Sequence, residues 1–298
     1  MIASRVTPRV VLLVLMLQTG VWIGLHLHVL FGGSHRQEDT ELFFFATASA
    51  VAYALAFVLN LEIAREYRDN VWMRWSWLLL AGNAGLSIGR EIVESPLLNS
   101  VLIGYAGSPL ARVHHQMVIG LANSCLILGL AGMWWAYQRV RLGFRIGRRE
   151  YAQIGVIVVI TLALLISRKG MSEGASPYLA SRLLQPLGLV LLSFAAAISV
   201  VLHGMAVQMG GGKLAVALRC LTLYTLVRAT LVLVEALLSL TSPERRQTHD
   251  LTMFLDLLCW RTVPWILVLA AAYRAELTVH ARKALDRQRA GKAALATA

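Results

Sequence analysis

The sequence predicts an all-α protein, a polytopic bundle of membrane-spanning helices. Of its 298 residues, 57% are hydrophobic and only 15% are charged, and the mean hydropathy is +0.64. Ordinary soluble domains are much more polar. Apolar runs of about 20 residues, the length that crosses a bilayer, recur along the whole chain. We therefore expect one transmembrane domain over residues 1–298, with no separate soluble domain.

Eight spanning helices are expected. They fall near residues 10–31, 42–64, 71–92, 116–138, 152–167, 179–207, 214–240 and 251–275. The fifth segment is short, so an alternative has seven spanning helices and a re-entrant fifth segment. Gly20-x-x-x-Gly24 and Gly85-x-x-x-Gly89 would let neighbouring backbones approach closely. This spacing predicts that the first and third helices pack in the interior of the bundle.

The basic residues indicate the orientation of the chain. They gather before the first helix, in alternate loops and in the tail, including the loop at 139–151 and the segment 276–298. The positive-inside rule then places both termini in the cytoplasm, as an even number of helices requires. This topology accounts for the net charge of +12 without a nucleic-acid partner. We expect an integral protein of the bacterial cytoplasmic (inner) membrane, whose basic loop and tail face membrane lipids or a partner protein.

Aromatic residues gather near the predicted cytoplasmic ends of the third and fourth helices. They are Trp72, Trp75, Trp77, Trp134, Trp135 and Tyr137. Tryptophan and tyrosine are enriched at membrane interfaces, so these side chains are predicted to anchor the helices there.

The last two predicted helices carry charges inside apolar segments. The seventh contains Arg228 and Glu235, and the eighth contains Asp256 and Arg261. An unpaired charge in hydrocarbon costs several kcal/mol, so these groups must face protein, water or one another. By the helical rise, both carboxylates lie about 7.5 Å from the shared turn and both arginines about 15 to 18 Å from it. Two interpretations stay open: an ion-paired network that joins the third, seventh and eighth helices, or a functional site.

Other polar residues fall at a similar depth, toward the outer face. We therefore predict a cavity open to that face. Its candidate catalytic residues are Glu235 and Asp256, which would serve as proton donor and acceptor. Its candidate ligand-binding residues are Arg90, Glu91, His114, Arg182, Gln185, Arg228 and Arg261. Arginine suits carboxylate and phosphate groups, so an anionic ligand is expected.

No motif defines a metal site. HExxH and CxxC are absent, and the three cysteines lie inside apolar segments. No cofactor is predicted. The alternative is a haem b between the first and fourth helices, held by His26 or His28 with His114 or His115. His26 and His28 are two residues apart and point to nearly opposite faces, so they would not ligate one metal together.

Several late charges resemble those of the fungal lipid-translocating exporter-like family of seven-helix membrane proteins. The resemblance rests on Arg228 and Glu235, followed by a polar turn with His249 and then Asp256. The segments IGREIVES and HHQM add to it. It implies a helical membrane bundle with charged pairs near the outer ends of the late helices. This chain departs from the family in having an extra first helix and in lacking its closer arginine, tyrosine and glutamate spacing.

The function expected from these features is binding, transport or processing of a lipid-like or amphipathic anionic small molecule. One alternative is a sensory or signalling membrane module, or an accessory subunit of a membrane complex, because no catalytic motif is recognisable. Another is a haem or quinone electron-transfer subunit. Whether the protein is an enzyme stays open at this point.

Overall fold

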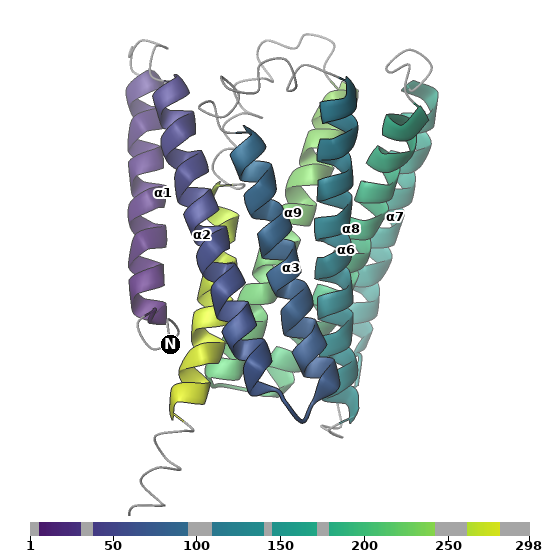
Figure 1. Ribbon diagram of the computed structural model, residues 1–298. Helices are drawn as coiled ribbons and strands as arrows, with labels where there is room; N and C mark the ends of the chain where they lie inside the picture. The colour runs from purple at the N-terminus through teal and green to yellow at the C-terminus, as the bar shows by residue number, and fades with distance from the viewer. Residues whose placement is uncertain are drawn as a thin grey trace, which may run out of the picture.

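The computed structural model describes residues 6–30, 38–94, 109–139, 145–171, 179–241 and 261–280. It describes side chains for residues 6–21, 23–24, 46–91, 117–139, 145–166, 187–231 and 261–280. Figure 1 shows that these segments are nearly all helical and stand roughly parallel or antiparallel in one bundle. The all-α prediction is confirmed for the described residues.

The described residues form eight helices. They are α1 (Pro8–Leu30), α2 (Glu38–Glu66), α3 (Val71–Glu94), α6 (Pro109–Arg139), α7 (Arg148–Met171), α8 (Leu179–Gln208), α9 (Lys213–Thr241) and the C-terminal helix (Arg261–His280). Within the described residues, six helices are long and apolar enough to cross a membrane: α2, α6, α7, α8, α9 and the C-terminal helix. The protein is thus a helical membrane bundle, and the count of eight spanning helices stays a prediction.

The short fifth segment of the sequence forms a full-length helix. α7 is continuous over 24 residues and is one of the six helices that could cross a membrane. It extends beyond its apolar stretch at both ends, where polar and charged residues continue the helix. The re-entrant alternative therefore has no support in the geometry of this segment.

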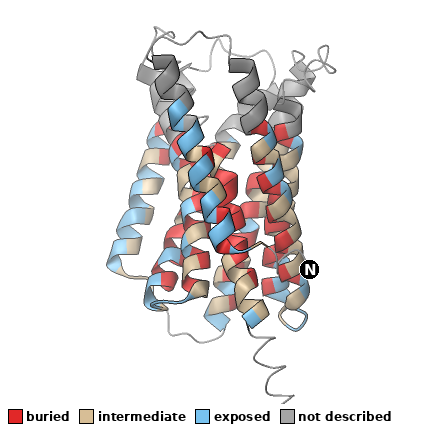
Figure 2. Ribbon diagram, turned by 90° about the vertical axis from the view of Figure 1, so that its left-hand side faces the viewer, coloured by how far each residue is buried: buried red, intermediate tan, exposed pale blue. Residues whose placement is uncertain are grey.

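The C-terminal helix lies at the centre of the bundle. Nearly every residue from Val263 to Ala272 is buried, and Figure 2 shows buried residues concentrated in the middle of the molecule. Most neighbours along the chain pack side by side: α2 on α3, α3 on α6, α7 on α8 and α8 on α9. In addition, α8 packs on α6, which precedes α7 in the sequence. The other helices thus surround the C-terminal helix.

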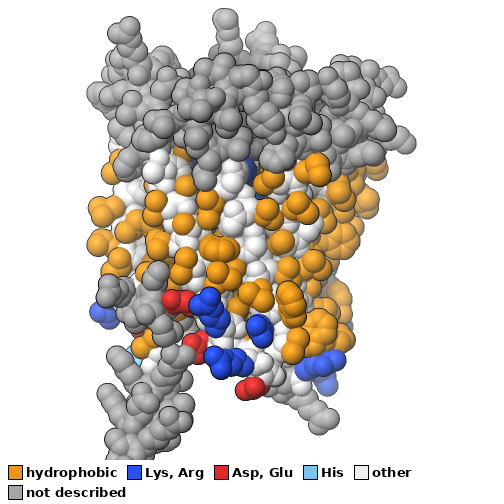
Figure 3. Space-filling view, in the orientation of Figure 1, with side chains coloured by type: hydrophobic (Ala, Val, Ile, Leu, Met, Phe, Trp, Pro, Cys, Tyr) orange, Lys and Arg blue, Asp and Glu red, His pale blue; other side chains and the backbone are white. Residues whose placement is uncertain are grey.

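Both described ends of the chain lie at the same end of the bundle, together with many basic side chains (Figures 1 and 3). Two contacts fasten the C-terminal helix there. Lys213 at the start of α9 forms an ion pair with Glu276 at 2.6 Å, and Arg274 donates through Nε to the hydroxyl of Tyr67 at 2.8 Å. We refer to this end as the basic end.

Two expectations about packing were wrong. A side chain added at Gly20 or Gly24 would meet no atom of the described residues within 4 Å, because α1 lies at the edge of the bundle with much of its apolar surface exposed. On α3 the expectation holds for Gly85, whose added Cβ would lie 3.3 Å from Phe57 of α2, but not for Gly89, where an added Cβ would meet no described atom within 4 Å. Trp77 is only 2% exposed, so it packs in the core and does not anchor the helix at the interface.

Candidate functional site

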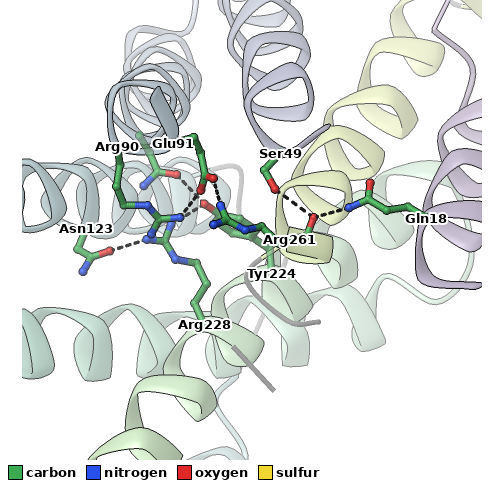
Figure 4. A network of polar contacts seen from close by, with 9 residues as sticks. Gln18, Ser49, Arg90, Glu91, Asn123, Tyr224, Arg228 and Arg261 are labelled. Atoms are coloured by element: carbon green, nitrogen blue, oxygen red, sulfur yellow. Dashed lines mark hydrogen bonds and ion pairs between the residues drawn. The ribbon is translucent and has the colours of Figure 1, made fainter. Parts of the chain in front are cut away.

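A buried carboxylate lies between two guanidinium groups in the upper half of the bundle. The side chain of Glu91 on α3 is fully buried. Its Oε1 accepts a hydrogen bond from Arg90 Nη2 at 2.5 Å, and its Oε2 accepts one from Nη1 of Arg261 on the C-terminal helix. Figure 4 shows the two guanidinium groups on either side of the carboxylate. These contacts join α3 to the centre of the bundle.

A third guanidinium group lies beside them and is held by neutral oxygen atoms. Arg228 on α9 donates through Nη1 to the hydroxyl of Tyr224 at 2.6 Å and through Nη2 to Oδ1 of Asn123 on α6 at 3.2 Å. The Tyr224 hydroxyl in turn donates to Oδ1 of Asn83 at 2.8 Å, and Asn83 Nδ2 donates to the Ala122 carbonyl at 2.7 Å. These acceptors orient the guanidinium group.

The first two helices contact the same region through the backbone of Arg261. Its carbonyl oxygen accepts hydrogen bonds from Gln18 Nε2 of α1 at 3.0 Å and from Ser49 Oγ of α2 at 3.4 Å. Figure 4 shows these two side chains meeting at the Arg261 carbonyl oxygen, while the Arg261 guanidinium group extends toward Glu91. Buried polar groups need such partners in a membrane bundle, because no water is available to replace them.

Together these residues form what we call the arginine network: Arg90, Glu91, Arg228 and Arg261, with Asn83, Asn123 and Tyr224 as neutral partners. At about 1.5 Å per residue, Arg228 lies about 22 Å above the start of α9 and Glu91 about 30 Å above the start of α3. The network therefore lies in the half of the bundle away from the basic end. All of its members are at least nine-tenths buried.

A narrow crevice between α3 and α6 reaches the network. It is lined by Leu86, Ser87, Arg90, Val118, Ile119, Ala122 and Arg228. It contains about 170 Å³ of empty space but leaves no room for a water molecule. Around these residues the side chains are thus closely packed, and any molecule bound between Arg90 and Arg228 would have to part α3 from α6.

The structure brings together four of the residues predicted from the sequence: Arg90, Glu91, Arg228 and Arg261. The others lie outside the described side chains. They are His114, Arg182, Gln185 and Glu235, whose helices are described but whose side chains are not, and Asp256. The candidate haem ligands His26, His28 and His115 are outside as well. Among the described residues, no group of three or more His, Cys, Asp and Glu could hold a metal ion.

The sequence interpretation missed the neutral members of the network. Asn83, Asn123 and Tyr224 are each at most 3% exposed, and Gln18 is 7% exposed. A signal was present, since an amide or hydroxyl inside an apolar helix must find a buried partner. That signal does not say which partner, because the choice depends on how the helices are rotated against one another.

The chemistry of the network is that of anion recognition. The guanidinium group stays protonated in proteins and presents five N–H donors in a planar fork. Two such groups, those of Arg90 and Arg261, contact the Glu91 carboxylate, and a third, that of Arg228, lies beside them. Guanidinium forks bind carboxylate and phosphate oxygens in pairs.

Comparison with known proteins gives no match: no family model, no curated protein and no solved structure matches this chain. The likeness to the seven-helix exporter-like family therefore rests on the scattered residues that suggested it.

Proposed function

We propose that this protein is a multi-pass membrane protein that binds an anionic, amphipathic small molecule at the arginine network. The observation that carries the proposal is the convergence of Arg228, Arg90 and Arg261 on one buried region. Charged residues inside a membrane bundle are costly to keep, and they mark binding sites and ion pathways more often than they serve packing alone.

Arg90 and Arg228 are the pair that would contact the ligand. Both line the crevice between α3 and α6, and Ser87 adds a hydroxyl group on the same surface. Arg228 is oriented by Tyr224 and Asn123, so its position is set before a ligand arrives. Such pre-organisation reduces the entropy lost on binding. A phosphate or carboxylate group between the two forks would receive charge-assisted hydrogen bonds from both sides.

The proposal includes an orientation for the chain. With eight spanning helices and both termini in the cytoplasm, the arginine network lies in the outer half of the membrane. A ligand would enter from the outer face, between the upper ends of α3 and α6. Glu235 and Asp256 belong to the same proposed site as proton donor and acceptor, which would let the protein process or transport its ligand as well as bind it.

Native mass spectrometry of the purified full-length chain tests the proposal. We expect an anionic lipid-like molecule to remain bound to the wild-type protein and to Arg68→Gln, which removes an exposed arginine at the basic end. The molecule should be lost from Arg228→Gln. Arg228→Lys keeps the charge but not the fork, so it should fold and retain less of the molecule than wild type.

Two outcomes would count against this function. One is a wild-type protein that carries no anionic molecule when it is extracted gently from its own membrane. The other is equal retention by wild type and by folded Arg228→Gln and Arg228→Lys. Either result would leave the network as an ion-paired scaffold.

A further inference from the structure

An apolar groove runs along the outside of α3 and α6 near the basic end, far from the arginine network. Its volume is about 450 Å³, within the range of about 300 to 1,000 Å³ that is typical of small-molecule sites. It is lined by Trp72, Trp75, Ser76, Leu79, Leu128, Ala131, Gly132, Trp134 and Trp135. Trp72 and Glu91 are separated by about 28 Å along α3. We call this feature the tryptophan groove.

The groove exists because α3 and α6 approach closely at its floor. A Cβ atom at Gly132 would lie 2.5 Å from Ser76 Oγ, and one at Gly129 would lie 3.1 Å from the Ser76 carbonyl oxygen. The Ser76 hydroxyl donates to the Trp72 carbonyl at 2.7 Å. The Ser76 hydroxyl thus has its partner within α3, and small residues leave the space that the tryptophan rings enclose.

A cation lies at the end of the groove nearest the basic end. The guanidinium carbon of Arg139, in the last turn of α6, lies 6.0 Å from the ring centroid of Trp72 and 5.5 Å from that of Trp135. The two rings meet edge to face, with centroids 6.4 Å apart. Among the described side chains, Arg139 has no carboxylate partner, and stacking on the rings leaves the N–H edges of its guanidinium open to a ligand.

We propose that the tryptophan groove binds one anionic glycerophospholipid of the leaflet at the basic end, with an acyl chain in the groove and the phosphate on Arg139. The apolar lining matches an acyl chain, and the tryptophan rings lie where the headgroup region of the bilayer meets its hydrocarbon. Because lipid tails are as apolar as the groove, hydrophobicity alone would not select a lipid. The positive charge of Arg139 therefore determines which lipid headgroup is preferred.

The sequence that follows Arg139 strengthens this selection. Arg141, Arg145, Arg148 and Arg149 come within the next ten residues. Basic residues next to a membrane attract anionic lipids and disfavour a headgroup that carries its own cation. The proposal is independent of the arginine network, since it concerns the opposite end of α3 and the other leaflet.

Quenching of tryptophan fluorescence by brominated lipids tests the proposal. The full-length chain is reconstituted in phosphatidylcholine bilayers, and lipid with brominated acyl chains is added as phosphatidylglycerol or as phosphatidylcholine. We expect wild type to bind the brominated phosphatidylglycerol about fivefold more tightly, the size expected for one basic residue at an anionic surface. Arg139→Gln should remove this preference, and Ala131→Phe, which fills the groove, should reduce quenching by both lipids.

The matched control is Val159→Phe, which adds the same ring to an exposed position of α7 and should behave as wild type. Equal quenching of wild type by the two brominated lipids would overturn the proposal. So would a preference for phosphatidylglycerol that persists in both Arg139→Gln and Ala131→Phe, because it would then come from the general charge of the protein surface. Unchanged helical circular dichroism in each variant shows that the comparison is between folded proteins.

Discussion

Arg261 of the C-terminal helix donates to the fully buried carboxylate of Glu91 on α3, and Arg90 donates to the same carboxylate from the other side. One carboxylate thus accepts hydrogen bonds from two guanidinium groups in a buried part of the bundle. Removing it would leave both arginines without this partner. Breaking one side of a buried ion pair costs about 3 to 5 kcal/mol.

Glu91→Gln is therefore expected to destabilise the detergent-solubilised protein by about 3 to 5 kcal/mol. The measurement is the thermal midpoint, compared with those of Arg261→Gln and of the double variant. Since the two residues are in contact, the double variant should lose less stability than the sum of the two single losses. Strictly additive losses would mean that Glu91 and Arg261 do not interact in the folded protein.

Tyr224→Phe should lower the stability of the protein by about 1 to 3 kcal/mol, less than Glu91→Gln does. It removes a hydroxyl that accepts from Arg228 and donates to Asn83, but it leaves the aromatic ring in place. Thermal unfolding in detergent measures this loss. The control is Tyr151→Phe on α7, where the ring is 63% exposed and the loss of a hydroxyl should have no effect. A Tyr224→Phe protein as stable as wild type would contradict the hydrogen bonds described for this side chain.

Gly132→Ala tests the close approach of α3 and α6. The added methyl group would lie 2.5 Å from Ser76 Oγ, so the helices or the serine must shift. We expect a loss of about 1 to 3 kcal/mol, as for other over-packed positions. Combining it with Ser76→Ala removes the oxygen and should restore most of the stability, since the Ser76 Cβ would be 3.7 Å away. Failure of the second change to restore stability would place the strain elsewhere.

Variants of Glu235 and Asp256, on the last two predicted helices, distinguish a structural role of the buried charges from a functional one. If Glu235 and Asp256 face a wet site, Glu235→Gln and Asp256→Asn should leave the yield and the thermal midpoint nearly unchanged while the protein loses its ligand or activity. Arg228→Gln and Arg261→Gln should lower both, because these arginines are buried in the network. Carboxylate variants that lose as much stability as the arginine variants would assign all four charges to the scaffold.

The orientation in the membrane can be checked with single cysteines. In a chain without Cys125, Cys220 and Cys259, cysteines placed at residues 35, 104, 174 and 245 should react with an impermeant thiol reagent in intact cells, since the positive-inside rule puts these loops outside. A cysteine in place of Arg145 should stay protected. Reaction at position 145 together with protection at position 245 would invert the topology.

Much of the fold could be predicted from the sequence because apolar runs of about 20 residues have few alternatives in a membrane. The predicted segments match the observed helices apart from their ends: α6 begins at Pro109, and α7 extends from Arg148 to Met171. Polar residues continue these helices past the apolar stretch, where a hydrophobicity criterion stops. The position of α1 at the edge was not predictable from its glycines, since close approach also needs a neighbour on that face.

The arginine network was predictable only in part. The depth of Arg228 and Arg261 followed from the helical rise, and both do lie in one network. The sequence pointed to an interaction with the third helix but not to Glu91 as the carboxylate that accepts from Arg261. Pairing depends on the rotation of each helix about its own axis, which apolar composition does not determine. The roles of Asn123 and Tyr224 were hidden for the same reason.

The pairing of Arg261 with Glu91 also has a consequence for how the chain is made. The two residues are 170 positions apart, and a ribosome adds about 5 to 20 residues per second, so the carboxylate exists for about 10 to 30 s before this partner does. During that interval the third helix must enter the membrane with Glu91 already in it. Arg90, the adjacent residue, already forms an ion pair with that carboxylate at 2.5 Å. The neighbour in sequence can act as a counter-ion during biogenesis, and the last helix to emerge completes the pairing.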